Sequence, residues 1–151
     1  MADLRQVFQK TIDTFIKNNT LAVKKKDTTL LSSVLTDDCI RMYRPLSFVR
    51  QYPQFFKPQI TNADYEAQME SELLTMQDAS QNITRTVIDT TQRAATVWVE
   101  KTVHTAASSS TVEVVYDLSF TGDGSQISQV VEFVDTSESI KVLEQILSKM
   151  A

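Results

Sequence analysis

The sequence predicts an α+β fold in which helices cover one face of an antiparallel sheet. Three long segments of strand character succeed one another at residues 94–106, 111–120 and 127–135. Short turns join these segments, and strands joined in this way pair antiparallel. Amphipathic helical patterns precede and follow the strands instead of alternating with them, which is typical of α+β proteins. The length of 151 residues fits a single domain with one core.

The first part of the chain predicts two helices, a short strand and an irregular segment. Apolar residues recur at helical spacing over residues 3–19, and Asp27 can cap a short second helix. A strand follows at 39–44. The segment 45–58 contains the three prolines of the chain and four aromatic residues, so it should hold no regular helix. We expect this loop to lie over the mouth of a cavity; packing on an ordinary core would explain the aromatic residues equally well.

The later elements follow from capping residues and from short apolar runs. Asn62 can cap a third helix over 63–76, which carries an apolar stripe. A strand at 85–89 then leads through a hairpin turn into the three long strands. After the last strand, Ser137 can cap a C-terminal helix.

Composition excludes several classes of function. The net charge is −4, whereas a protein that binds nucleic acid through its phosphates needs a basic face. Cys39 is the sole cysteine, which excludes an internal disulfide and a cysteine-based zinc site, and the thiol should simply be packed. His104 is the sole histidine, so a multi-histidine metal site is excluded as well.

We expect no signal for export or for membrane insertion. Its first residues have charges that no apolar stretch follows, unlike a signal peptide. No apolar run approaches the roughly 18–20 residues that a membrane span needs. We therefore expect a soluble cytoplasmic protein with no membrane partner.

Four motifs spread over nearly the whole chain carry a resemblance to a known family. They are the N-terminal amphipathic helix, Thr-Asp-Asp-Cys at 36–39, Arg-Ala-Ala-Thr-Val-Trp-Val at 93–99, and the strand 124–135 that ends Glu-Phe-Val-Asp. Together they resemble the NTF2-like superfamily, in particular its SnoaL-like or ketosteroid-isomerase-like group. The stretches 39–45, 62–65 and 116–120 are similar to small fungal SnoaL-like proteins of secondary metabolism.

This resemblance implies a fold, an activity and a partner. The fold would be a cone, with a curved sheet and N-terminal helices around an apolar pocket, plus a C-terminal helix. The activity would be that of an isomerase or cyclase that uses no cofactor and no metal. Such proteins rearrange meroterpenoids, or act as a semipinacolase on prenylated indole alkaloids. The partner would be a hydrophobic small molecule, and the chain would form a homodimer. A non-catalytic NTF2-like module that binds a ligand or a protein is the alternative.

Enzymes of this fold place acids, bases and hydrogen-bond donors in an apolar cavity, so the candidates are polar side chains that point inward. Alternation places Tyr116 on the apolar face of its strand, where its hydroxyl could orient a substrate oxygen or merely reach a backbone carbonyl. The resemblance implies a polar catalytic side chain on the last strand. Glu132 is the first candidate for the acid or base and Asp135 the second; a salt bridge at the rim would explain either residue without catalysis.

An arginine on the first strand is a further candidate, because a buried guanidinium can hold a carboxylate or stabilise developing negative charge. Arg41 is preferred to Arg44, which lies on the opposite face. Which face of the longest strand lines the pocket stays open, because both its valine face and the face with Trp98 are apolar. The side chains expected to bind substrate are Tyr65, Met69, Trp98, His104 and Asp135.

Overall fold

The computed structural model describes the chain over residues 3–150, and the side chains there except those at 145, 146, 149 and 150. The first element is helix α1, Leu4–Lys25, which is longer than the predicted 3–19. The side chain of Asp3 accepts a hydrogen bond from the backbone N–H of Arg5 and caps the helix start. Lys26 ends the helix in the left-handed conformation, with φ 54°.

The next elements include two that differ from their prediction. Asp27 caps a turn of 3-10 helix, η1 (Thr28–Ser32), as expected. Strand β1, Leu35–Arg44, begins four residues earlier than the predicted strand at 39–44, because Leu35 pairs with Ile127. A short helix, α2 (Leu46–Gln51), lies where no regular helix was expected. Pro45 precedes it, and proline is tolerated at a helix start although not in its interior.

Helix α3 and strand β2 follow each other without a loop. Helix α3, Asn62–Thr75, is capped by Thr61 in a reciprocal capping box with Asp64, and not by Asn62 as predicted. Strand β2, Met76–Asp89, is far longer than the predicted 85–89. The ammonium group of Lys26 closes the junction, because it donates hydrogen bonds to the carbonyl oxygens of Leu73 and Met76.

The remaining strands match their predictions closely. They are β3 (Ala94–Thr105), β4 (Ser109–Phe120) and β5 (Ile127–Phe133), followed by helix α4 (Thr136–Met150). Asp135, and not Ser137, caps α4, because its carboxylate accepts a hydrogen bond from the N–H of Glu138. No helix in the described part of the chain is long and apolar enough to span a membrane.

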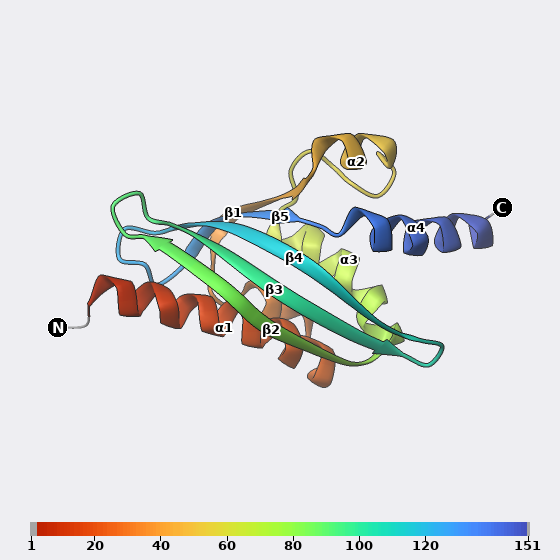
Figure 1. Ribbon diagram of the computed structural model, residues 1–151, viewed down its shortest axis with the longest axis horizontal. Helices are drawn as coiled ribbons and strands as arrows, with labels where there is room; N and C mark the ends of the chain where they lie inside the picture. Colours follow the sequence, from red (N-terminus) through yellow and green to blue (C-terminus); the bar gives the residue numbers. More distant parts are fainter. Residues whose placement is uncertain (1–2, 151) are drawn as a thin grey trace.

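The five strands form one curved sheet in the order β1-β5-β4-β3-β2 (Figure 1). Neighbours pair antiparallel except β1 and β5, which run parallel, whereas the sequence predicted antiparallel pairing. Figure 1 shows α1 lying along one face of the sheet and α4 extending beyond the end of β5. The fold is therefore α+β, as predicted.

Helix α1 packs on what we call the covered face of the sheet. Phe8 stacks on Phe120 with ring centres 4.6 Å apart, and Phe15 meets Tyr116 edge-on at 5.3 Å. The covered face is apolar over most of β3 and β4, where Val97, Val99, Val114 and Leu118 are buried. The polar residues on this face cluster near β1 and β5, and this is where the candidate site lies.

Candidate active site

A buried ion pair forms the centre of the site. The Nη1 atom of Arg41 donates to Oε1 of Glu132 at 2.7 Å. The two side chains are 4% and 14% exposed, so most of this charge pair is removed from water. The two residues lie on neighbouring parallel strands, and β1 is fixed further by a two-way backbone bridge between Arg41 and Ile60. The structure brings together these two residues, which the sequence analysis named as candidates, and Arg44 lies on the opposite face of β1 as expected.

The guanidinium of Arg41 is packed on one side, but one of its terminal nitrogens has no hydrogen-bond partner among the described residues. The ring of Tyr65, from α3, lies against it with 3.7 Å between the guanidinium carbon and the ring centre. The Nη2 atom is buried and makes no hydrogen bond with any described residue. Burial alone lowers the pKa of the guanidinium, but the interactions with Tyr65 and Glu132 outweigh it, so the pKa of Arg41 is raised. Arg41 is therefore a permanent cation with an unused N–H group beside the carboxylate.

Tyrosines surround the ion pair. The pairing of the strands puts Tyr43, Glu132 and Tyr116 side by side in one row across β1, β5 and β4. Burial, followed by the negative charge of Glu132, raises the pKa of Tyr43 and Tyr116 well above the ordinary value. Burial also raises the pKa of Tyr65, to about 12. All three phenols are therefore neutral hydrogen-bond donors at neutral pH.

The aromatic segment after β1 covers this row from the outside. Phe56 meets the ring of Tyr43 at 5.2 Å between ring centres, and Phe48 packs against both Phe56 and Tyr52. The segment that was expected to lie over the mouth of a cavity therefore lies over Tyr43. Tyr43 was not singled out from the sequence as a site residue, although its position two residues after Arg41 on a strand gives it the same face.

Of the other predicted site residues, the structure keeps one beside this centre and separates three from it. Met69 is buried with Tyr65 in the cluster beneath α3, as the shared helical stripe predicts. Trp98 and His104 lie on the outer face, because Trp98 pairs with Val115 while its neighbour Val97 pairs with Tyr116. Asp135 lies beyond the end of β5, where its carboxylate caps α4.

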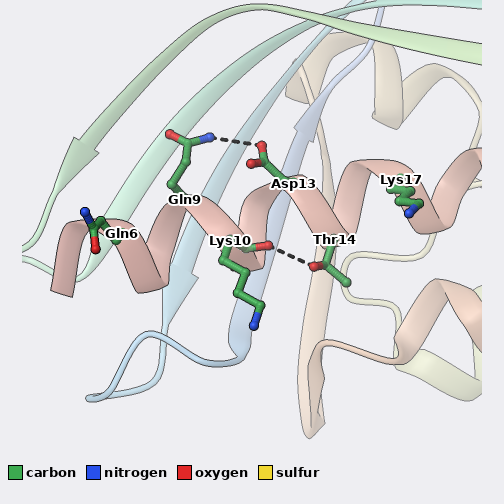
Figure 2. A pocket seen from close by; sticks show the side chains of 6 residues that line it. All are labelled: Gln6, Gln9, Lys10, Asp13, Thr14 and Lys17. Carbon is green, nitrogen blue, oxygen red and sulfur yellow. Dashed lines mark hydrogen bonds between the residues drawn. The ribbon is translucent and has the colours of Figure 1, made fainter. Parts of the chain in front are cut away.

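Two hollows of the described surface lie away from the ion pair. The larger one, of about 350 Å³, lies on the exposed side of α1 (Figure 2). Its lining residues are polar, and Gln9 donates to Asp13 within it at 3.0 Å. The smaller hollow, of about 260 Å³, lies between Lys26 and Leu74. Neither hollow opens onto Arg41, and aromatic side chains pack against Arg41 and Tyr116.

The described residues offer no cluster suited to a metal ion. No group of three or more histidine, cysteine, aspartate or glutamate side chains lies together among them. Cys39 is buried, and burial raises the pKa of its thiol to about 11. The thiol is therefore protonated at neutral pH and a poor nucleophile.

The buried phenols predict a delayed alkaline titration. Their pKa in the folded protein exceeds the value of about 10 in an unfolded chain, so the folded state binds these protons more tightly. The stability that they contribute is complete below about pH 10 and is lost as the pH rises through the folded values. Phenolate absorbance of Tyr43, Tyr65 and Tyr116 should therefore appear only together with loss of near-UV circular dichroism. Ionisation of these phenols near pH 10 in protein that stays folded would contradict their burial.

Comparison with solved structures shows the fold. A pinacolase, BvnE from Penicillium brevicompactum, superposes with a TM-score of 0.83 at 14% identity, over 99% of this chain and 100% of that one. PrhC from Penicillium brasilianum gives 0.80 at 14% identity over 98% and 93% of the two chains. An NTF2-like protein of unknown function from Burkholderia pseudomallei gives 0.67 at 12% identity over 89% and 95%.

Comparison by sequence gives no relative. No protein-family model matches the chain, and no curated protein matches it significantly. The order of elements, the curved sheet with α1 on its covered face and the three superpositions nevertheless agree with the resemblance in the sequence. The chain therefore has the NTF2-like fold.

Proposed function

We propose that the chain is an isomerase or cyclase that rearranges a hydrophobic polycyclic natural product by acid–base chemistry. One observation carries this proposal. A partly buried carboxylate, Glu132, is held by a guanidinium whose second terminal nitrogen is buried and has no hydrogen-bond partner among the described residues. A buried N–H group without a partner is costly unless a ligand or a water satisfies it. The free Nη2 of Arg41 thus marks the place where a substrate oxygen would bind.

Each residue of the centre has a role in this chemistry. Glu132 would take or give the proton, since Arg41 fixes its carboxylate in one orientation. The Nη2 group of Arg41 and the phenol of Tyr116 would donate hydrogen bonds to an oxygen that gains negative charge. A neutral phenol can donate in this way at neutral pH, and the raised pKa keeps Tyr116 in that form. Protein groups alone can therefore supply both the proton transfer and the charge stabilisation.

The surroundings favour an apolar substrate. Tyr65, Phe15 and Phe56 enclose the polar centre with aromatic surface, which suits a fused ring system that carries few oxygens. The superposition on a pinacolase supports a skeletal rearrangement of the semipinacol type, in which a group migrates to a neighbouring carbon. An alkaloid or a meroterpenoid would meet these requirements. Holding such a substrate in its reactive conformation would then decide the product.

Ligand retention tests whether the proposed site binds a small molecule. The protein is incubated with a small-molecule extract of a fungal culture, desalted, and analysed by mass spectrometry. We expect a polycyclic terpenoid or alkaloid to be retained by the wild type and lost from Arg41→Met. A protein that retains nothing from any extract, or that retains the same compound without Arg41, would contradict the proposed site.

A non-catalytic module is the second candidate, and one observation favours it. The covered face is filled by Phe8, Phe15 and their neighbours, and neither described surface hollow opens onto Arg41. A module of this kind would bind a protein through its surface and leave extracted small molecules unchanged. Capture of a protein with no retained small molecule would therefore favour the module.

We also propose a homodimer through the outer face of the sheet. Trp98, Phe133 and Val87 are 36%, 45% and 47% exposed there, and strand pairing links Phe133 through Val115 to Trp98. Glu100 and Glu113 lie directly opposite each other on the same face, an unfavourable pairing of like charges. Arg85 and Arg44 share this face. A second copy related by two-fold symmetry could therefore pair arginines with glutamates and cover the apolar row.

Sedimentation equilibrium tests the homodimer. We expect a species of twice 17.1 kDa for the wild type and one of 17.1 kDa for Trp98→Glu/Phe133→Glu. The control is Leu74→Glu, because Leu74 is 76% exposed but lies on α3, away from the sheet. A wild-type protein that sediments as a 17.1 kDa species at all concentrations would contradict the proposal.

A further inference from the structure

Helix α3 brings a second carboxylate to the site. Tyr65, Met69 and Glu72 follow one another at intervals of four and three residues, so they lie along one side of the helix. Tyr65 is the residue that lies against the guanidinium of Arg41. Glu72 therefore continues, toward the end of α3, the line of side chains that begins at the ion pair. It is exposed, whereas Tyr65 and Met69 are buried.

The strands opposite place a lysine at the same end of the site. Val97, Val99 and Lys101 alternate on the covered face of β3, and Val97 pairs with Tyr116. Lys101 pairs with Gln81 on β2, whose Oε1 atom is buried and has no partner among the described residues. The buried α3 residues Met69 and Leu73 belong to the cluster that contains Ala79 of β2 and Val103 of β3. Glu72 on α3 and Lys101 on β3 therefore both adjoin residues of this cluster, and the charge of Lys101 acts on the carboxyl group of Glu72.

Glu72 is electrostatically coupled to the ion pair. Desolvation by the surrounding protein raises the pKa of Glu72 even though the residue is exposed. Lys101 and Gln68 lower this pKa, and the negative charge of Glu132 raises it further. Glu72 in turn helps to raise the pKa of Tyr43 and of Tyr65. These mutual effects place Glu72 in the same network as Arg41 and Glu132.

We propose that Glu72 is the second acid–base group of this site, supplying a proton from its carboxylic acid form while Glu132 takes one. This inference rests on the proposed isomerase function. In a semipinacol-type shift, a substrate O–H bond breaks and its proton passes to Glu132. The C–O bond of an epoxide breaks as the group migrates, and the departing oxygen takes the proton of Glu72. One proton enters the substrate and one leaves, so the substrate is isomerised without change of mass.

The environments of the two carboxyl groups suit this division. Glu132 is held by a guanidinium at 2.7 Å, an arrangement that stabilises a carboxylate. Glu72 has no ion-pair partner within 4.0 Å among the described residues, and its pKa is raised. Two carboxyl groups in contrasting surroundings are the usual arrangement for an acid and a base in one site. The exposure of Glu72 also lets water restore its proton after each turnover.

Carbon-13 NMR titration of the glutamate carboxyl groups tests the coupling without any substrate. The resonance of Glu72 is assigned by its loss in Glu72→Gln. We expect its pKa to lie above the ordinary value, to fall in Glu132→Gln and to rise in Lys101→Gln. Glu70→Gln is the matched control, because Glu70 is exposed elsewhere on α3, and it should leave the Glu72 pKa unchanged. If Glu132→Gln does not fold, the rise in Lys101→Gln decides the matter, because Lys101 is not part of the ion pair.

Two results separate this inference from the proposed function. An ordinary Glu72 pKa, or one that does not respond to either Glu132→Gln or Lys101→Gln, would overturn the role of Glu72 and leave the Arg41–Glu132 site intact. When a substrate has been identified, the turnover rate of Glu72→Gln should be lower than that of the wild type by roughly 10²-fold or more. The wild-type rate should fall at high pH as Glu72 loses its proton, and this fall should be absent in Glu72→Gln. A rate and pH profile equal to those of Glu70→Gln would also overturn it. Equal turnover rates for the wild type and Glu132→Gln would instead count against the proposed function.

Discussion

Replacing Arg41 by methionine should lower the free energy of unfolding by about 3–5 kcal/mol. The substitution removes the cation but leaves Glu132, whose side chain is only 14% exposed, without its partner. A carboxylate without a partner in such a place is strongly destabilising. Methionine largely restores the apolar contacts of the arginine side chain, so lost packing contributes little. Urea unfolding followed by circular dichroism measures the change.

Two further variants separate the buried charge from other effects of this substitution. In Arg41→Met/Glu132→Leu both charges are gone, and most of the lost stability should return. Lys141→Met breaks the exposed pair with Glu138, whose side chains are 65% and 36% exposed, and should cost less than about 1 kcal/mol. A double variant no more stable than Arg41→Met would show that the ion pair is not the cause of the loss.

The second large effect is expected at Gly124. This residue has φ +77°, a conformation that costs other residues about 1–2 kcal/mol. A β-carbon added there would lie 2.1 Å from Cδ1 of Phe8, which is fully buried and stacked on Phe120. Overpacking a core in this way costs about 1–3 kcal/mol more. Gly124→Ala should therefore lose about 2–5 kcal/mol in urea unfolding, and α1 would have to shift to accept it.

Gly122→Ala is the natural control, because it makes the same chemical change two residues away. The nearest atom to a β-carbon at Gly122 is Nε of Arg93, at 3.8 Å, which is ordinary contact. Its stability should stay within about 0.5 kcal/mol of the wild type. Equal losses in the two variants would mean that Phe8 is not packed against the turn as described.

The side of β4 on which Tyr116 lies could be predicted, because strands alternate and the residues that share its face are apolar. Alternation also separates Arg41 from Arg44 on β1. The last strand is apolar on both faces, so Glu132 followed from the family resemblance and not from the two-residue period. The side of β3 could not be decided in this way, because valines and a tryptophan are both apolar. Pairing with β4 decides it, since Val97 stands beside Tyr116 and leaves Trp98 outside.

Other features depend on contacts between segments that are far apart in the sequence. The first half of β2 is polar and has no alternation of its own, but it pairs with β3 from Met76 onward. Asp135 resembles a strand-end acid in the sequence, yet α4 begins at the next residue, and only two residues separate it from β5. The packing of Tyr65 against Arg41, and the effect of the Lys101 charge on Glu72, depend on how α3 crosses the sheet, which no local pattern encodes.

The central claim is that the Arg41–Glu132 pair converts a bound hydrophobic compound into a rearranged product. The most direct measurement is liquid chromatography with mass spectrometry of a fungal small-molecule extract after incubation with wild type or with Glu132→Gln, once both are shown to be folded. We predict that the wild type converts one polycyclic compound into an isomer of equal mass and a different retention time, and that Glu132→Gln does not. Equal conversion by both proteins would contradict the role of this carboxylate. No conversion by the wild type in extracts that contain a compound it retains would contradict the catalytic function itself.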